Sequence, residues 1–260
     1  MSVKETIIKL GYSSEKGRVR EINEDSLYWV ESLDDKTRQV IGHLYIVADG
    51  MGGYTAGEIA SKIAVDTIAQ HYQYGFTQNI PSTLLKAIQV ANDEIYQQAQ
   101  TRQMNMGTTV LSAVIRGNDL YLGYIGDSRG YLLRANKISK LTEDHTLVNE
   151  LLKNGAITSQ EAEFHPQRHV LSRALGKKPE VTPDIVGPVK VQPGDVILLC
   201  TDGIWSYIEE SQIEYSLLTN INNPQMAAES LTQFADVTGG NDNATAIVLK
   251  LEKVVPVTNI

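Results

Sequence analysis

Apolar residues in this chain follow two different periods, one typical of strands and one typical of helices. Short runs rich in β-branched and aromatic residues predict strands, and a spacing of three to four residues predicts amphipathic helices. These elements come in blocks rather than in strict alternation, which favours an α+β layered sandwich over a doubly wound sheet. Strands are expected at residues 6–11, 26–30, 43–48, 108–115, 119–125, 130–134, 137–141, 195–200 and 244–251, and helices at 55–72, 82–103, 147–153, 159–164, 209–218 and 224–237.

Residues 146–179 depart from this pattern. They contain only short helical pieces, the dipeptide His165-Pro166 and the loop 176–179. Such a stretch is typical of exposed, irregular structure, so we expect a surface flap here.

Composition excludes more classes of function than classes of fold. The chain has 260 residues, enough for one domain with a substantial core, and its net charge is -8. That charge disfavours binding to nucleic acid and to anionic membranes, so neither partner is expected. The sequence contains no apolar run of about 18 residues and no signal peptide, and its single cysteine, Cys200, fits a reducing compartment. We therefore expect a cytoplasmic protein, and a monomer.

Aspartates in short glycine-rich breaks are the most informative chemical feature. Asp-Gly directly after an apolar run places a carboxylate at the end of a strand, with little side-chain cover beside it. Several such ends at one sheet edge would form a cluster of hard oxygen ligands. Clustered carboxylates repel each other and persist mainly where a cation neutralises them, so the pattern indicates a divalent metal site. The residues are Asp25, Asp49, Asp127, Asp202 and Asp242.

Each motif taken alone has an ordinary structural explanation. A single Asp-Gly is usually a turn, the loop around Asp242 is strongly polar, and residues 20–25 are typical of a solvated charge run. The functional alternative is that Arg20 grips an anionic substrate while Glu24 or Asp25 holds a metal or its waters. The two Asp-Gly segments share one pattern, which favours a pair of carboxylates facing each other.

The segment 126–130 matches G-x-S-x-G, the pattern of a hydrolase nucleophile elbow. The residues after Ser128 predict a strand rather than a helix, so we expect a hairpin within a β-meander over residues 108–141, and a serine esterase is disfavoured. A cysteine phosphatase is also disfavoured, because the required arginine six residues after Cys200 is replaced by Ser206. Cys200 is expected to be a core thiol.

The histidines lack the spacing of a zinc site. His43 and His71 are expected on the surface or in packing. His145 and His169 lie at the rim of the predicted flap, where contact with a substrate is an alternative for each.

Six motifs together carry a family resemblance that none carries alone. The chain resembles the bacterial form of the metal-dependent Ser/Thr protein phosphatases of type 2C, from about residue 8 to residue 250. The resemblance implies one catalytic domain over residues 1–260, built as a four-layer αββα sandwich with two central antiparallel sheets and a flap subdomain at about 145–179. The motifs are Arg20 with Asn23-Glu24-Asp25, residues 47–53 (VADGMGG), 106–109 (MGTT), 126–129 (GDSR), 201–203 (TDG) and 240–243 (GNDN).

The same resemblance implies roles for individual residues. Asp49 would bridge two tightly bound Mg2+ or Mn2+ ions, with Asp202 and Asp242 completing the protein ligands of the first. The Gly50 carbonyl and Asp25, with Glu24 beside it, would serve the second ion. Further implied roles are a weaker third ion at Asp127 with Asp202, and phosphate binding by Arg20.

Two positions depart from the family pattern. Met51 stands where many members have a histidine proposed to protonate the leaving group, so water or His169 would supply that proton. Tyr54 stands where some bacterial members have a histidine, so it would contact the substrate differently.

The implied reaction is hydrolysis of phosphoserine or phosphothreonine in protein substrates by metal-activated water, with no covalent intermediate. The alternatives are a non-catalytic regulator, which the complete set of acidic residues disfavours, and a two-metal nuclease, which the acidic charge and the lack of a basic stripe disfavour.

Overall fold

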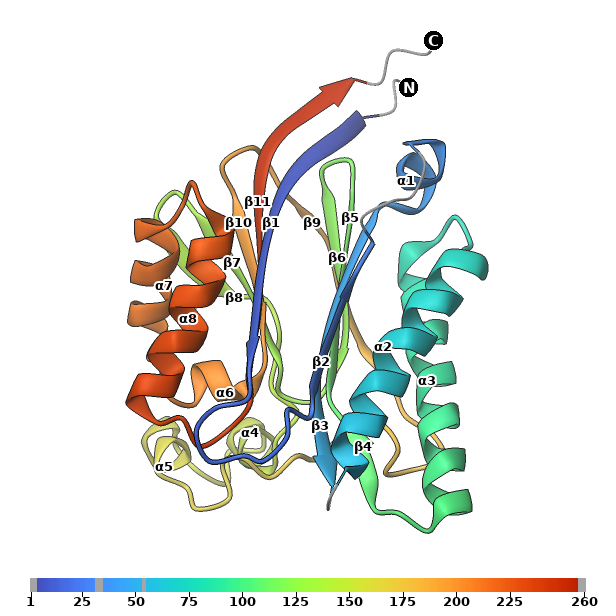
Figure 1. Ribbon diagram of the computed structural model, residues 1–260, viewed down its shortest axis with the longest axis vertical. Coiled ribbons are helices and arrows are strands. Elements are labelled where there is room, and N and C mark those ends of the chain that lie inside the picture. The colour runs from blue at the N-terminus through green and yellow to red at the C-terminus, as the bar shows by residue number, and fades with distance from the viewer. Residues whose placement is uncertain (1–3, 31–34, 53–54, 257–260) are drawn as a thin grey trace.

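Two antiparallel β-sheets packed face to face form the centre of the molecule (Figure 1). The structure is a computed structural model that describes residues 4–30, 35–52 and 55–256. The first sheet has the order β1 (Lys4–Glu15), β11 (Ala244–Pro256), β10 (Val196–Cys200), β7 (Arg129–Arg134) and β8 (Lys137–Lys140). The second has the order β2 (Asp25–Trp29), β3 (His43–Gly52), β5 (Val110–Arg116), β6 (Asp119–Ile125) and β9 (Asp184–Lys190), with β4 (Met106–Thr108) paired to β3.

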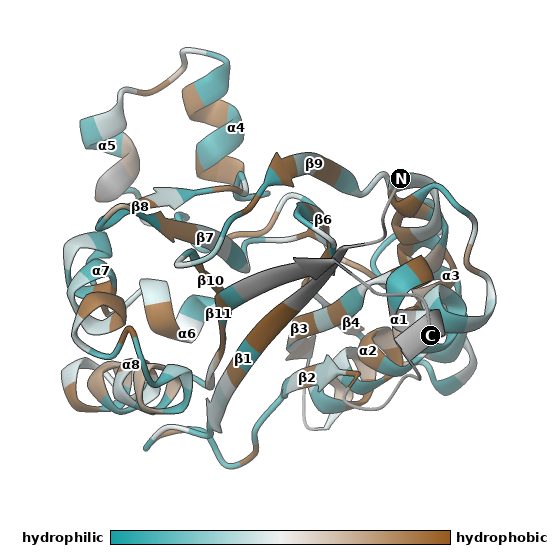
Figure 2. Cartoon of the chain, turned by 90° about the horizontal axis from the view of Figure 1, so that it is seen from above, coloured by the Kyte–Doolittle hydropathy of each residue, from teal (hydrophilic) through white to brown (hydrophobic). Residues whose placement is uncertain are grey.

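Helices cover the outer face of each sheet. The long pair α2 (Ala56–Tyr74) and α3 (Ile80–Arg102) lies on the second sheet, and α6 (Asp202–Trp205), α7 (Glu210–Thr219) and α8 (Pro224–Thr238) lie on the first. Seen from above, α4 (Leu147–Lys153) and α5 (Ser159–Glu163) stand apart from the sandwich (Figure 2). The remaining helix is α1 (Asp35–Ile41). None of the helices in the described residues has the length and apolar content needed to cross a bilayer.

The central strands are buried on both faces. In β3, Leu44, Ile46 and Ala48 pack against the helices, whereas Tyr45 and Val47 point into the space between the sheets. In β10, alternate residues divide in the same way between the helical layer and the other sheet. Because successive side chains of a strand point to opposite faces, a strand covered on both sides needs an almost continuous apolar run. This requirement explains the uninterrupted apolar segments that end at Asp49 and just before Asp202.

Capping residues set where α3 and α8 begin. The Asn79 side chain accepts a hydrogen bond from the backbone N–H of Ser82 (3.0 Å), and the Asn223 side chain accepts one from Met226 (3.2 Å). Each cap is followed closely by a proline, which needs no N–H partner in the first turn.

The observed architecture confirms the predicted αββα sandwich with two antiparallel sheets. The predicted meander over residues 108–141 is wrong, because β6 and β7 lie in different sheets and the segment 126–128 crosses between them rather than forming a hairpin. Alternation of apolar residues is the same for strands of either sheet, so it does not reveal the crossing. Four short or half-exposed elements, α1, β4, α6 and β9, were not predicted as separate elements.

Candidate active site

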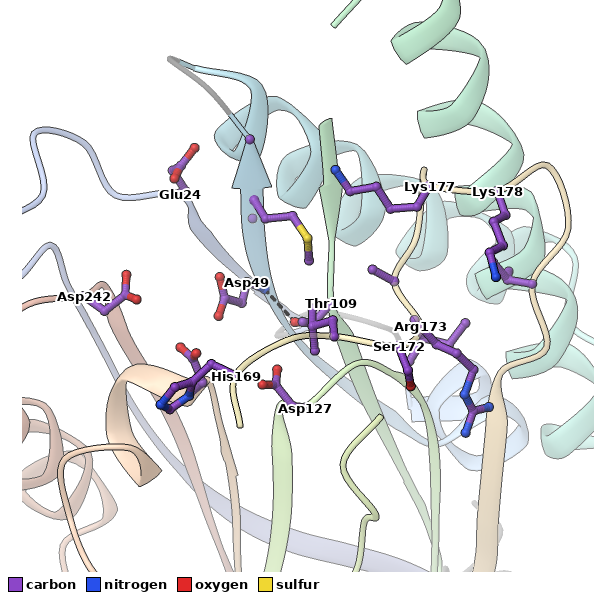
Figure 3. Close-up of a pocket in the computed structure, with 18 of the residues that line it drawn as sticks. Glu24, Asp49, Thr109, Asp127, His169, Ser172, Arg173, Lys177, Lys178 and Asp242 are labelled. Carbon is purple, nitrogen blue, oxygen red and sulfur yellow. Dashed lines mark hydrogen bonds between the residues drawn. The ribbon is translucent and has the colours of Figure 1, made fainter. Parts of the chain in front are cut away.

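A pocket of about 770 Å³ opens between the ends of the two sheets and the segment 169–182 (Figure 3). Asp49, Asp127 and Asp242 are directed toward one another on one side of it, with His169 close by. The sequence-predicted residues that line the pocket are Arg20, Glu24, Asp49, Gly50, Asp127, His169, Asp202 and Asp242.

Asp25 and Asp49 face each other across neighbouring strands, since they are register partners in the β2–β3 pair. The backbone of Asp49 is fixed by two threonines. Its N–H donates to Thr109 Oγ1 (3.0 Å), and its carbonyl accepts from the Thr109 N–H (2.9 Å) and from the Thr108 hydroxyl (2.8 Å). The Thr108-Thr109 pair therefore holds Asp49 in position, a role that sequence reasoning missed.

The other sheet contributes Asp202 and Asp242. Asp202 follows β10 and is the first residue of α6, and Asp242 precedes β11, the neighbour of β10. The carboxyl groups of Asp49 and Asp202 share a hydrogen bond, which joins the two sheets at this end. The prediction that the aspartates meet at one sheet edge is thus corrected: they come from strand ends of both sheets.

Asp25 and Asp127 are the buried aspartates of this cluster. Asp25 Oδ2 accepts a hydrogen bond from the Thr201 hydroxyl (2.8 Å), whereas its Oδ1 is buried and has no hydrogen-bond partner among the described residues. Asp127 is 3% exposed, and its backbone carbonyl accepts from Nε1 of Trp205 (3.0 Å). A buried carboxylate oxygen with no donor is costly, and a cation would satisfy it.

Burial and mutual repulsion act together on these carboxylates. Burial is the largest cause that raises the pKa values of Asp25 and Asp202, and repulsion by neighbouring aspartates raises them further. The pKa of Asp25 rises to about 7 and the pKa of Asp202 to about 6. The same two causes hold the pKa values of Asp49 and Asp127 well above the usual range. Four acids that resist ionisation together form a site suited to polyvalent cations.

The cluster is open rather than closed. Within the described part of the chain, no group of three or more His, Cys, Asp and Glu side chains is already arranged to hold a metal ion. Carboxylates without a cation repel each other, and Mg2+ sites are completed by water and backbone oxygens. The burial and mutual repulsion of the acids, with the unpartnered Oδ1 of Asp25, fit divalent cations.

Glu24 and Gly50 meet where β2 and β3 approach the start of α2. Glu24 Oε1 accepts from the backbone N–H of Gly57 (3.1 Å), and the Gly50 N–H donates to the Glu24 carbonyl (3.2 Å). A Cβ atom at Gly50 would lie 2.2 Å from the Gly57 carbonyl oxygen, so only glycine fits there. Burial raises the pKa of Glu24.

Arg20 lies at the rim of the cluster with 45% of its side chain exposed. Its guanidinium contacts Asp242 at 2.8 Å and Glu24 at 3.8 Å. Coulombic attraction from these acids outweighs desolvation and raises the pKa of Arg20. Arg20 thus lies beside the acidic cluster, and its predicted role in phosphate binding stays a prediction.

Aromatic stacking positions the other side of the site. His169 stacks on Trp205 with ring centroids 6.1 Å apart, and the Arg129 guanidinium lies 3.6 Å from the centre of the same indole. Arg129 is held by a 2.7 Å ion pair with Asp144. Trp205 thus connects His169 to the backbone of Asp127. Sequence reasoning missed Trp205, although its position three residues after Asp202 was a signal.

The predictions for His145 and Tyr54 have different outcomes. His145 is buried, accepts from the Gly126 N–H at Nδ1 (3.1 Å) and faces Asp184 through Nε2 (3.2 Å), so it supports the crossing segment and does not line the pocket. Tyr54 lies outside the described residues.

Comparison with known proteins decides the family. A sequence model of protein phosphatase 2C matches residues 10–151. The serine/threonine phosphatase stp of Listeria monocytogenes is 35% identical over 245 residues, which cover 92% of this chain and 94% of that protein. The chain belongs to the protein phosphatase 2C family. The phosphatase PhpP of Streptococcus pneumoniae is also similar, with 36% identity over 214 residues that cover 81% of this 2C phosphatase and 86% of that one.

Solved structures extend the likeness to the whole fold. The phosphatase PstP/Ppp of Mycobacterium tuberculosis has a TM-score of 0.84 and 35% identity, covering 95% of this chain and 99% of that one. The catalytic domain of PstP in complex with two manganese ions has a TM-score of 0.81 and 32% identity, covering 96% and 100%. These findings confirm a metal-dependent 2C phosphatase that uses Mg2+ or Mn2+.

Proposed function

We propose that this 2C phosphatase hydrolyses phosphoserine and phosphothreonine in proteins at the acidic side of the pocket, with two divalent cations and no covalent enzyme intermediate. The observation that carries the proposal is the convergence of five aspartates from two sheets, four of them with strongly raised pKa values. Such a cluster is stable in its ionised form only with cations beside it.

The residues that would hold the cations follow from position. Asp49 is central, because it faces Asp25 on its own sheet and hydrogen-bonds Asp202 of the other, so we assign it to both ions. When bound, Mg2+ or Mn2+ lowers the pKa of water and screens the charge of the phosphate. The remaining assignments are Asp202 and Asp242 for the first ion, the Gly50 carbonyl and Asp25 with Glu24 for the second, and Asp127 with Asp202 for a weaker third.

Arg20 is assigned to the phosphate. Its guanidinium is half exposed at the rim and already binds an oxyanion, the carboxylate of Asp242. A planar fork with five N–H donors matches phosphate as well as carboxylate, so Arg20 would orient the ester and stabilise the charge that develops on it.

The thiol and hydroxyl groups near the pocket support hydrolysis by water. Ser128 is 2% exposed, and its hydroxyl is bonded to Thr109 Oγ1 (2.8 Å). Burial raises the pKa of the Cys200 thiol to about 12, so the nucleophilic thiolate is absent at neutral pH. Neither the serine of the G-x-S-x-G match nor the cysteine is placed to attack a phosphate.

Either His169 or solvent would donate the proton to the leaving alkoxide. Met51 lines the pocket but carries no acidic proton. Burial, helped by Arg168 and Arg129, lowers the pKa of His169, so its imidazole is mainly neutral at pH 7. We assign His169 to contact with the substrate and to proton donation at acidic pH. At higher pH, solvent would donate the proton.

Contact between Tyr54 and the substrate stays a prediction. The same holds for a monomer, a cytoplasmic location, the flap boundaries and the absence of nucleic-acid and membrane partners.

Phosphate release from matched phosphoserine, phosphothreonine and phosphotyrosine peptides, with Mn2+ and with EDTA, tests the proposal. We expect release from the first two peptides with Mn2+ and almost none after chelation. Release that continues undiminished in EDTA would refute it, and inhibition by a serine-directed reagent in the same sample would support the esterase alternative.

A further inference from the structure

The pocket has a second half with the opposite charge. Arg173, Lys177 and Lys178 line the side that faces away from the aspartates, with Thr109 and Ser172 between the two groups (Figure 3). We call Lys177 and Lys178 the lysine pair. The proposed reaction uses only the acidic half of the pocket, so it gives this half no function. The pocket, at about 770 Å³, has room for more than one phosphorylated side chain.

The loop that carries the lysine pair is fixed by one buried asparagine. Asn92 of α3 is 1% exposed. Its Nδ2 donates to the backbone carbonyls of Lys178 (3.0 Å) and Pro179 (3.2 Å), and its Oδ1 accepts from the Gly176 N–H (2.9 Å). Gly176 has φ +78°, and a Cβ atom there would lie 2.4 Å from the Ile95 side chain. The loop is therefore held in one conformation against the helix.

The positive charge of the lysine pair is not neutralised. Lys177 Nζ donates to the neutral amide oxygen of Asn105 (2.9 Å) and has no acidic partner among the described residues. Partial desolvation lowers its pKa. Arg173, by contrast, is paired with Asp184 at 2.8 Å. One carboxylate, Glu180, also lines this wall, so two lysines against one acid leave it positive. Both lysines are exposed and available to a ligand.

We propose that the lysine pair forms a subsite for an acidic side chain that flanks the phosphorylated residue of a protein substrate. This inference rests on the proposed function, because it requires the phosphate to lie at the acidic half. A chain with net charge -8 repels acidic partners at long range, so a local cationic site beside the reaction centre gives acidic sequences a contact that neutral ones lack. Lysine binds a carboxylate as a point charge, so the preference depends on charge and not on one fixed geometry.

The test compares matched phosphothreonine peptides that differ only in a flanking pair, Glu-Glu or Gln-Gln, placed on either side of the phosphothreonine. For the protein with Mn2+, we expect kcat/KM to favour the Glu-Glu peptide by about tenfold in one of the two placements, as for a charge-assisted contact of exposed groups. The preference should shrink in about 0.5 M NaCl, because salt screens attraction between exposed charges. The screening length falls from about 10 Å at 0.1 M to about 3 Å at 1 M.

Charge reversal locates the effect. The double variant Lys177→Glu/Lys178→Glu should lose the preference or reverse it, and Lys178→Arg should keep it. The control is Lys137→Glu, an exposed lysine in register with Arg134, at the far end of β7 from Asp127. It carries the same change of charge as each single substitution of the double variant, and should keep the wild-type ratio.

Each outcome separates the two proposals. If the wild type hydrolyses p-nitrophenyl phosphate with Mn2+ but shows equal kcat/KM for Glu-Glu and Gln-Gln peptides in both placements, the subsite is refuted and the proposed function stands. A shift of the ratio in Lys137→Glu as large as in the double variant would also refute it. If the wild type fails to hydrolyse p-nitrophenyl phosphate, the proposed function fails and the subsite fails with it.

Discussion

The two halves of the pocket carry opposite charges, and they are built in opposite ways. The acidic half places carboxylates on strand ends, buried and close enough to raise one another's pKa values. The lysine pair lies on an exposed loop whose backbone is held by the buried amide of Asn92.

This difference separates two uses of charge. Buried like charges are unstable alone, so the acidic half depends on a bound cation, and its loss has a large effect. Exposed charges are hydrated and screened, so the lysine pair adjusts the choice of substrate by modest factors.

Asp49→Asn should remove the centre of the acidic half. We expect turnover of p-nitrophenyl phosphate with Mn2+ to fall by about a thousandfold, because Asp49 is the residue that would hold both cations. The isosteric amide relieves repulsion among the buried acids, so the fold should persist by circular dichroism. Activity close to wild type would show that the reaction does not depend on this residue.

Arg20→Ala tests the rim of the acidic half. Loss of a charge-assisted contact of about 1–3 kcal/mol should lower kcat/KM about tenfold to a hundredfold. Arg18→Ala is the matched control, since Arg18 is also exposed but pairs with Asp236 at 2.9 Å. Equal kinetics for the two variants would exclude Arg20 from the site.

Asn92→Ala should affect only the lysine half. Removal of three hydrogen bonds that hold the loop should lower the free energy of unfolding by about 1–3 kcal/mol, and the exposed Gln97 of the same helix, changed to Ala, should alter it by less than about 0.5 kcal/mol. Denaturant unfolding measures both. Weakened Mn2+ binding in Asn92→Ala would contradict the separation of the halves.

The metal-free protein should lose stability as the pH rises. A carboxyl whose pKa is higher in the folded chain than in the unfolded chain stabilises the fold only while it is protonated, and Asp25 and Asp202 have folded pKa values of about 7 and about 6. The unfolded value is about 3.9, so this contribution disappears between about pH 4 and pH 7. We expect Tm without metal to be about 5 °C lower at pH 8 than at pH 5, and Mn2+ or Asp25→Asn to reduce that difference. A Tm that rises over this range would contradict the account.

The sequence predicted best what depends on local periodicity. Residues 119–125 and 147–153 match β6 and α4, because doubly buried strands and capped helices have strong patterns. The half-exposed edge strand β9 and the four-residue α6 have little apolar pattern, so they were missed.

In the candidate site, too, some features were visible in the sequence and others depend on the fold. The aspartates were visible as breaks after apolar runs, but their convergence from two sheets depends on strand register and on the crossing at Gly126. The support of Asp49 by Thr109 and of the lysine loop by Asn92 comes from residues more than 50 positions away, and no local pattern reveals such contacts.

Calorimetric titration of the metal-free protein with Mn2+ tests the central claim most directly. The account predicts two tight ions per chain, two in Asp127→Ala, and none in Asp49→Asn. Tight binding of both ions by Asp49→Asn, or fewer than two by the wild type, would contradict it.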